Sequence, residues 1–174
     1  MTEGLVTDAM RACIGTSMPA VLAPEEISPS EVRRFLAVVG DTNPLYRDDL
    51  YARSLGYAGR VVPPMLILQF LWRMLGSDGA STRAASDWPG LTLPPAYTNS
   101  RNASQEVTWL LPVYVGDRLE LQHFLKDIYV RQGRAGVPVI YLVRETQIRN
   151  QTGALVVRQL ATVAKLPESA VKNA

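Results

Sequence analysis

The residues best suited to chemistry in this chain lie between Gly40 and Met65. Asp41, Asn43 and Tyr46 fall within GDTNPLY, so a carboxylate, a carboxamide and a phenol come within a few positions of one another. Such groups can hold a water molecule or a hydroxyl through hydrogen bonds. A tyrosine with an ordinary pKa near ~10 stays protonated at neutral pH and is a poor general base. Tyr46 is therefore better suited to orienting water than to removing protons.

Two of these side chains also have structural interpretations. Asp41 follows Gly40 at an expected helix end, where an aspartate often accepts hydrogen bonds from the nearby backbone in a turn. Tyr46 is equally consistent with a packing residue whose hydroxyl finds a partner at the rim of the core. Both alternatives stay open at this point.

Helices are expected on both sides of these residues. Ser28 and Glu31 form a capping box with Pro29 at the first helical position, which predicts an amphipathic helix to about Gly40. Pro44 keeps residues 41–46 from continuing it, so an exposed turn is expected there. A short helix over about 48–55 follows, and a second, apolar on nearly all sides and so expected to be buried, runs from 63 to 76.

The second half of the chain has the pattern of an antiparallel sheet. From Val107 onward apolar residues alternate with polar ones, and glycine-containing turns separate three expected strands over 118–130, 139–149 and 155–166. An early strand near residues 18–22 is expected to add to them. Residues 77–100 show no period and are expected to form either a functional lid or a mobile loop. The expected fold class is α+β, with the sheet wrapped around one apolar helix.

Composition excludes several classes of protein. The formal charge of +2 comes from scattered residues, which argues against nucleic-acid binding. The apolar run over 65–75 is too short to span a membrane, and no early apolar run indicates a signal peptide, so a cytoplasmic location is expected. The single cysteine, Cys13, indicates no disulfide and no metal site. We expect one domain over 1–174, with a core over about 14–166, a flexible N-terminus and a C-terminal tail.

Three segments carry a resemblance to a known family: GDTNPLY at 40–46, GYAGRVVPPM at 56–65 and PVYVGDRLEL at 112–121. On these segments the chain resembles the MaoC-like hot-dog acyl-thioester hydratases and dehydratases, and most closely the non-catalytic subunits of mycobacterial-type (R)-3-hydroxyacyl dehydratases. The resemblance covers roughly residues 14–166. It implies a hot-dog domain and requires neither a metal nor any other cofactor.

Two parts of the pattern of the active members are replaced in this chain. Those carry Asp-x-Asn-Pro-x-His, and Tyr46 stands where the histidine is expected. They also carry His-Gly at the start of the central helix, where this chain has Pro63 and Pro64. Proline has no backbone N–H, so Pro64 cannot polarise a thioester carbonyl, and the Met65 amide is the nearest substitute. The resemblance implies catalytic positions Asp41, Asn43 and Tyr46 and substrate-binding positions Pro63, Pro64, Met65, Leu66 and Phe70.

These departures favour a subunit that shapes the acyl tunnel while a second MaoC-like subunit, in a heterodimer or heterotetramer, supplies the Asp/His site. The substrate implied is an acyl-CoA or an acyl carrier protein thioester. A homodimeric, self-sufficient hydratase that uses Asp41 and Tyr46 is the first alternative, and a non-catalytic acyl-thioester binding protein is another. A hot-dog thioesterase is less favoured.

His123, the single histidine, shares strand parity with Leu121 and Leu125 and is expected to be a structural residue with satisfied hydrogen bonds, with an interface role left open. Arg60, Arg101 and Arg118 are weak candidates for phosphate contacts.

Overall fold

The structure, a computed structural model, describes residues 4–74, 88–133 and 136–168. The helices are α1 (Asp8–Ala12), α2 (Pro29–Val39), the 3-10 helix η1 (Pro44–Tyr46), α3 (Asp49–Ser54) and α4 (Pro64–Met74). The strands are β1 (Val21–Leu22), β2 (Asn99–Trp109), β3 (Glu120–Gln132), β4 (Pro138–Arg149) and β5 (Leu155–Leu166). They form one antiparallel sheet in the order β1-β3-β4-β5-β2.

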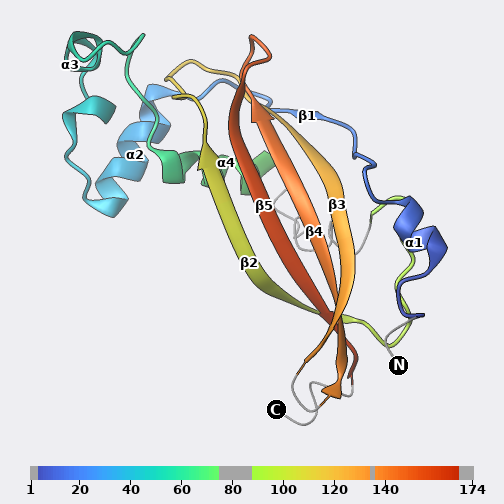
Figure 1. The fold of residues 1–174 in the computed structure, drawn as a ribbon. Helices are drawn as coiled ribbons and strands as arrows, with labels where there is room; N and C mark the ends of the chain where they lie inside the picture. The colour runs from blue at the N-terminus through green and yellow to red at the C-terminus, as the bar shows by residue number, and fades with distance from the viewer. Residues whose placement is uncertain (1–3, 75–87, 134–135, 169–174) are drawn as a thin grey trace.

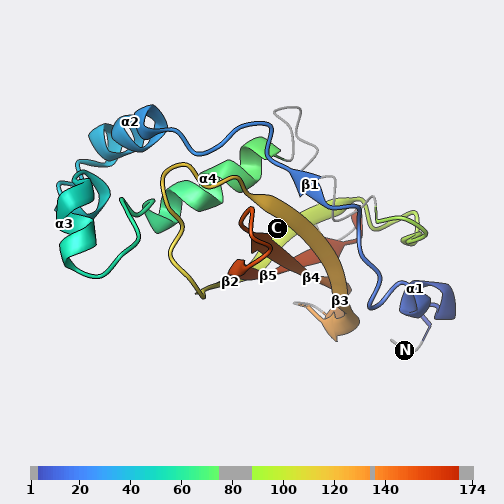
Figure 2. The ribbon, with the colours of Figure 1, turned by 90° about the horizontal axis from the view of Figure 1, so that it is seen from above.

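The sheet curves around α4, which lies along its inner face (Figure 2). α2 and α3 lie together at one end of the molecule and α1 lies at the other (Figure 1). This arrangement confirms the α+β prediction of an antiparallel sheet wrapped around a central helix. In the described part of the chain, no helix is both long and apolar enough to cross a membrane.

The expected capping of α2 is present. The Ser28 hydroxyl accepts a hydrogen bond from the Glu31 N–H at 3.2 Å, and the Glu31 carboxylate accepts one from the Ser28 N–H at 3.1 Å. At the other end, Gly40 has a φ of 70°, a left-handed conformation that ends the helix and turns the chain toward Asp41. The sequence therefore predicted both limits of the helix that leads into the candidate site.

The strands agree with the expected meander over β3, β4 and β5, but β2 was missed. Its sequence, NSRNASQEVTW, has almost no apolar alternation, because most of its side chains are exposed. Backbone hydrogen bonds to β5 hold it in the sheet. Such bonds need no side-chain pattern, so the sequence carried no signal for this edge strand.

Two apolar clusters fill the inner side of the sheet. One joins α2, the start of α4 and the ends of the strands nearest to them, through residues such as Leu36, Leu66 and Ile148. The other lies at the opposite end of β3 and β4 and includes Met10 and Trp88.

The structure differs from three expectations drawn from the sequence. The core begins before residue 14, because Met10 is 1% exposed. The expectation of a lid or mobile loop over 77–100 does not hold for 88–98, where Trp88 and Tyr97 are buried, and 77–87 lie outside the described residues. α4 is not buried on all sides, since Met65 is 63% exposed and this chain covers only the other side of the helix start.

Gly40→Ala is predicted to lower the free energy of unfolding by roughly 1 kcal/mol, because an L side chain is strained at this left-handed φ. A Cβ at this position would meet nothing within 4 Å, so the loss reports backbone strain alone. Gly40→Asn is the matched control and should lose less, since asparagine tolerates this conformation better. Urea unfolding followed by circular dichroism measures both. Equal stability of the glycine and alanine proteins would contradict the left-handed helix end.

Candidate active site

Backbone hydrogen bonds bring the three recognised segments together. The Val61 N–H donates to the Leu45 carbonyl at 3.3 Å, and the Val62 N–H donates to the Val113 carbonyl at 2.8 Å. The carbonyl of Arg60 in turn accepts a bond from the Val115 N–H at 3.1 Å. Segments 40–46, 56–65 and 112–121, which are far apart in the sequence, therefore meet at the start of α4.

Asp41 lies directly after the end of α2. Its N–H donates to the Leu36 carbonyl at 3.1 Å, and its Oδ1 accepts a hydrogen bond from the Asn43 N–H at 2.8 Å. Arg47 Nε donates to the Asp41 carbonyl at 3.1 Å, which also holds the turn. One carboxylate oxygen thus maintains the turn, and within the described residues Oδ2 accepts no hydrogen bond. The structural and functional interpretations of Asp41 are therefore compatible.

Asn43 caps the 3-10 helix η1. Its Oδ1 accepts a hydrogen bond from the Leu45 N–H at 3.0 Å, and its carbonyl accepts one from the Tyr46 N–H at 3.2 Å. The side chain is exposed. Asn43 therefore fixes the start of the 3-10 helix that ends at Tyr46, and its side-chain oxygen is used within this turn.

Tyr46 is half-buried and packs against the cluster formed with α2 and α4. Burial raises the pKa of its phenol, and the charges of Asp41 and Tyr57 raise this pKa further. All three causes favour the protonated phenol, so Tyr46 is a hydrogen-bond donor at neutral pH. The carboxylate of Asp41 therefore acts on the phenol through its charge, and both side chains line the same pocket.

The start of α4 follows the two prolines. Pro63 is buried, and its carbonyl accepts a hydrogen bond from the Leu66 N–H at 3.0 Å. The Met65 N–H donates to no acceptor among the described residues. It lies at the positive end of an 11-residue helix, where an oxyanion is favoured.

A pocket of about 780 Å³ opens over these groups. Five predicted site residues line it: Asp41, Tyr46, Pro63, Pro64 and Met65. Five others were not predicted: Phe35, Val39, Leu68, Gln69 and Gln105. Gln69 interrupts the apolar run of α4, and that was a signal, but nothing in the polar sequence of β2 marks Gln105. The volume falls within the range of small-molecule sites, about 300–1,000 Å³.

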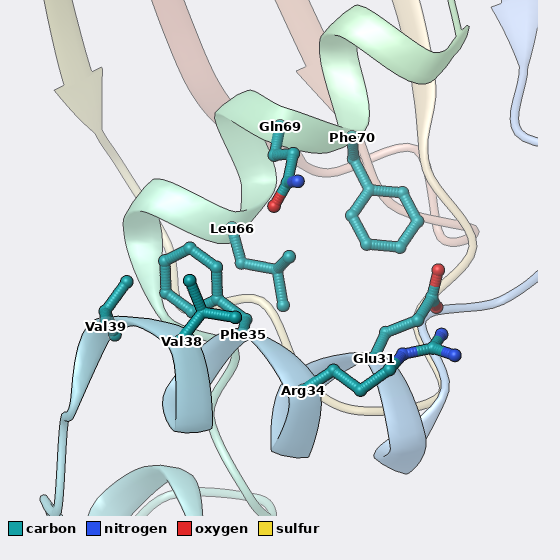
Figure 3. Close-up of a pocket in the computed structure, with 8 residues that line it drawn as sticks. All are labelled: Glu31, Arg34, Phe35, Val38, Val39, Leu66, Gln69 and Phe70. Atoms are coloured by element: carbon teal, nitrogen blue, oxygen red, sulfur yellow. The ribbon is translucent and has the colours of Figure 1, made fainter.

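Leu66 and Phe70, also predicted as wall residues, line a neighbouring groove of about 450 Å³ between α2 and α4. Figure 3 shows both side chains pointing from α4 toward α2, with Leu66 next to Phe35 and Phe70 on the side of Glu31. The groove shares Phe35, Val39 and Gln69 with the pocket, so the two spaces are adjoining.

His123 does not lie in the pocket. It sits on β3 and is 3% exposed, so it cannot stand in for the histidine that Tyr46 replaces. Of the candidate phosphate ligands, Arg118 donates through Nε to the Ala23 carbonyl at 2.9 Å, which is a structural contact. No cluster of acidic, histidine or cysteine side chains in the described ranges could hold a metal ion.

A five-stranded antiparallel sheet wrapped around one helix, with an acid and a phenol beside the helix start, defines a MaoC-like hot-dog domain of the hydratase and dehydratase class. The chain belongs to the family described as FAS1-like, dehydratase domain region, which matches residues 12–159.

The chain is also similar to individual proteins. The chain is 27% identical over 158 residues to a UPF0336 protein of Streptomyces griseus subsp. griseus, covering 90% of this chain and 95% of the relative. Its fold is similar to the ChsH1–ChsH2 complex from Mycobacterium tuberculosis, with a TM-score of 0.72, 19% identity and coverage of 91% and 89%. It is also similar to the (R)-hydratase from A. caviae involved in PHA biosynthesis, with a TM-score of 0.57, 26% identity and coverage of 88% and 96%.

Asp41→Asn is predicted to lower the pKa of Tyr46, because removing a negative charge favours the phenolate. Carbon NMR of protein labelled at tyrosine Cζ measures this, and Tyr46→Phe identifies the signal among the seven tyrosines. Asp8→Asn, in α1 at the other end of the molecule, is the control and should leave the titration unchanged. An unaltered Tyr46 titration in Asp41→Asn would show that the Asp41 carboxylate does not act on the Tyr46 phenol.

Proposed function

We propose that this chain is the tunnel-shaping subunit of an (R)-specific 3-hydroxyacyl-thioester dehydratase, which acts in reverse as an enoyl-thioester hydratase. A second MaoC-like chain supplies the aspartate and histidine that transfer the proton. The acyl group is carried as a thioester of CoA or of an acyl carrier protein. The active assembly is a heterodimer or heterotetramer.

The observation that carries this proposal is the combination of Tyr46 in the pocket with the single histidine elsewhere. Tyr46 has a raised pKa and keeps its proton at neutral pH, so it does not serve as the general base. The other change, Pro64, removes a backbone donor at a position where one such donor typically contributes a few kcal/mol to transition-state stabilisation. Both changes weaken catalysis but leave an intact pocket.

Exposed apolar side chains support a partner. Val39, Met65 and Leu111 are 53%, 63% and 50% exposed. Val39 and Met65 also line the pocket. Exposed apolar groups around a pocket are typical of a surface that another chain covers.

β2 offers the geometry for such a pairing. It is an 11-residue strand at the edge of the sheet, and among the described strands it pairs with β5 alone. Gln105 belongs to β2 and lines the pocket, so a domain that extends the sheet at this edge would lie beside the pocket. The similar ChsH1–ChsH2 structure is itself a complex of two proteins.

The free Met65 N–H favours a second candidate, a self-sufficient hydratase. Here Asp41 would activate water, Tyr46 would orient it and Met65 would stabilise the developing enolate oxygen. A third candidate, a binding protein without turnover, has the same pocket but no reaction.

The pure chain is predicted to hydrate trans-2-enoyl-CoA thioesters at least 100-fold more slowly than its mixture with a MaoC-like partner that carries the intact Asp/His motif. The reason is that the base comes from the partner, and general-base catalysis contributes typically 10²–10⁴-fold. Loss of absorbance of the conjugated thioester measures the rate, and light scattering on the same samples measures mass.

The controls separate the candidates. Substituting the histidine of the partner's motif should abolish the activity of the mixture. Turnover by the pure chain that Asp41→Asn removes would contradict the accessory role and favour the self-sufficient hydratase. Binding of acyl-CoA with no turnover in any mixture would favour the binding protein.

Lysine substitutions on β2, Ala103→Lys with Thr108→Lys, are predicted to prevent assembly, because charged edge strands resist pairing. The mixture should then elute as separate chains and lose activity. Leu22→Lys on β1 is the matched control at the opposite edge and should leave assembly intact. Assembly that survives the β2 substitutions but fails with Leu22→Lys would place the interface at the other edge.

A further inference from the structure

The two apolar clusters on the inner face of the sheet are separated by polar side chains. His123 on β3 lies directly opposite Thr146 on β4, and Arg144 lies opposite the core residue Leu125. All four side chains therefore share the inner face of the sheet. We call His123, Arg144 and Thr146 the inner polar cluster.

The hydrogen bonds of the inner polar cluster are incomplete. His123 Nδ1 lies 2.8 Å from Thr146 Oγ1, but His123 Nε2 is buried and has no partner in the described part of the protein. Arg144 Nε and Nη1 are also buried, and within the same residues neither has an acceptor. The expectation that His123 is a satisfied structural histidine is thus correct for one ring nitrogen and wrong for the other.

A half-buried cation with two buried, unbonded nitrogens is costly for the free protein. Burial, and then the neighbouring Arg144, lower the pKa of His123 to about 4, so the imidazole is neutral at pH 7. Arginine keeps its charge even when buried, so the guanidinium remains a cation, and it forms no ion pair with the described residues. Desolvating such a group costs several kcal/mol unless an acceptor compensates it. The cost would be offset if a ligand supplies that acceptor.

The register of the sheet connects Arg144 to the pocket. Arg144 lies opposite Ala161 on β5, and Ala161 lies opposite Gln105 on β2, which lines the pocket. These three residues form a straight row across the inner face. Neighbouring strands are about 4.8 Å apart, so the backbone of Arg144 lies roughly 10 Å from the backbone of Gln105. Ala161 lies between Arg144 and Gln105, and its methyl side chain leaves space on the inner face between them.

We propose that the inner polar cluster is the far end of the acyl site, where Arg144 binds a carboxylate at the end of the acyl chain opposite the thioester. The substrate class is then an ω-carboxyacyl thioester. This inference rests on the proposed function, since it takes the pocket at the start of α4 as the acyl site. A carboxylate is favoured over a neutral oxygen because a charge-assisted hydrogen bond is about twice as strong and the cation lacks a counter-charge.

Equilibrium binding to the pure chain tests the proposal. The probes are glutaryl-, adipyl- and suberyl-CoA, each compared with the acyl-CoA of equal carbon number that ends in a methyl group. At the best chain length the carboxylate probe should bind at least tenfold more tightly in calorimetry. Arg144→Met should reduce this preference to less than twofold.

Arg158→Met is the matched control. Arg158 lies on the other face of β5, beside Glu145 and 46% exposed, so the preference should persist in that variant. A preference lost equally in both variants, or absent from the unaltered chain, would overturn the proposal. The same tenfold preference for a terminal-ketone acyl-CoA would also overturn it, since a neutral acceptor would then suffice.

Two further measurements do not depend on affinity. His123 is the single histidine, so one imidazole signal in nitrogen–proton NMR reports on the cluster. A bound carboxylate should raise the pKa of this imidazole from about 4, because an anion favours the imidazolium, and the methyl-ended probe should not.

Arg144→Met should raise the melting temperature of the free chain, because it removes an uncompensated charge. A lower melting temperature would place Arg144 in a satisfied structural network.

These readouts need no turnover and so separate this inference from the proposed function. An active mixture with no carboxylate preference would overturn the carboxylate site alone. A tenfold preference in a chain that supports no turnover in any mixture would overturn the dehydratase role and support an ω-carboxyacyl binding site.

Discussion

The short stretch of backbone that leads into α4 determines where every candidate group lies. Val61 and Val62 are hydrogen-bonded on one side to the turn that carries Tyr46 and on the other to the segment before β3. The two prolines that follow need no donors of their own, and their fixed φ suits the first turn of a helix. The positive end of α4 is thereby held beside Asp41 and Tyr46. Without these bonds the three recognised segments would not be held together, and Tyr46 would not be held beside the start of α4 in the pocket.

The inner face of the sheet combines two requirements that conflict. Packing around α4 needs apolar side chains, and both clusters supply them. Between the clusters, the chain keeps a histidine and an arginine whose polar atoms are incompletely bonded. Natural sequences rarely retain such a cost within a core unless a site requires it, so the conflict between packing and polarity is itself informative.

Local signals in the sequence predicted the parts of the fold that depend on local chemistry. The Ser28 capping box, Gly40 and the alternation of β4 and β5 each fix an element with residues inside that element. β2 could not be predicted because its place depends on bonds to a strand about sixty residues later. The exposure of Met65 likewise depends on what lies across from it in space.

The candidate site shows the same division. Asp41, Tyr46 and the prolines were found because they belong to short segments with a recognisable pattern. Gln105 and Arg144 belong to no such pattern, and their relation to the pocket exists only through the register of β4, β5 and β2. Strand parity placed His123 correctly on the apolar face, but its neighbour Arg144 comes from another strand. Pairing register across three strands is not encoded locally.

The two edges of the sheet differ, and this limits the ways in which the chain can assemble. Beyond β3 the edge is occupied by an irregular segment in which Met18 bonds to the His123 carbonyl and Pro19 offers no donor, and β1 itself has two residues. The β2 edge is 11 residues long, with one register irregularity between Asn102 and Ser104. A sheet with one receptive edge can add a single neighbour through that edge and then has none left to offer. Strand pairing through β2 would therefore give a closed pair of domains, in which growth stops, and not an open filament.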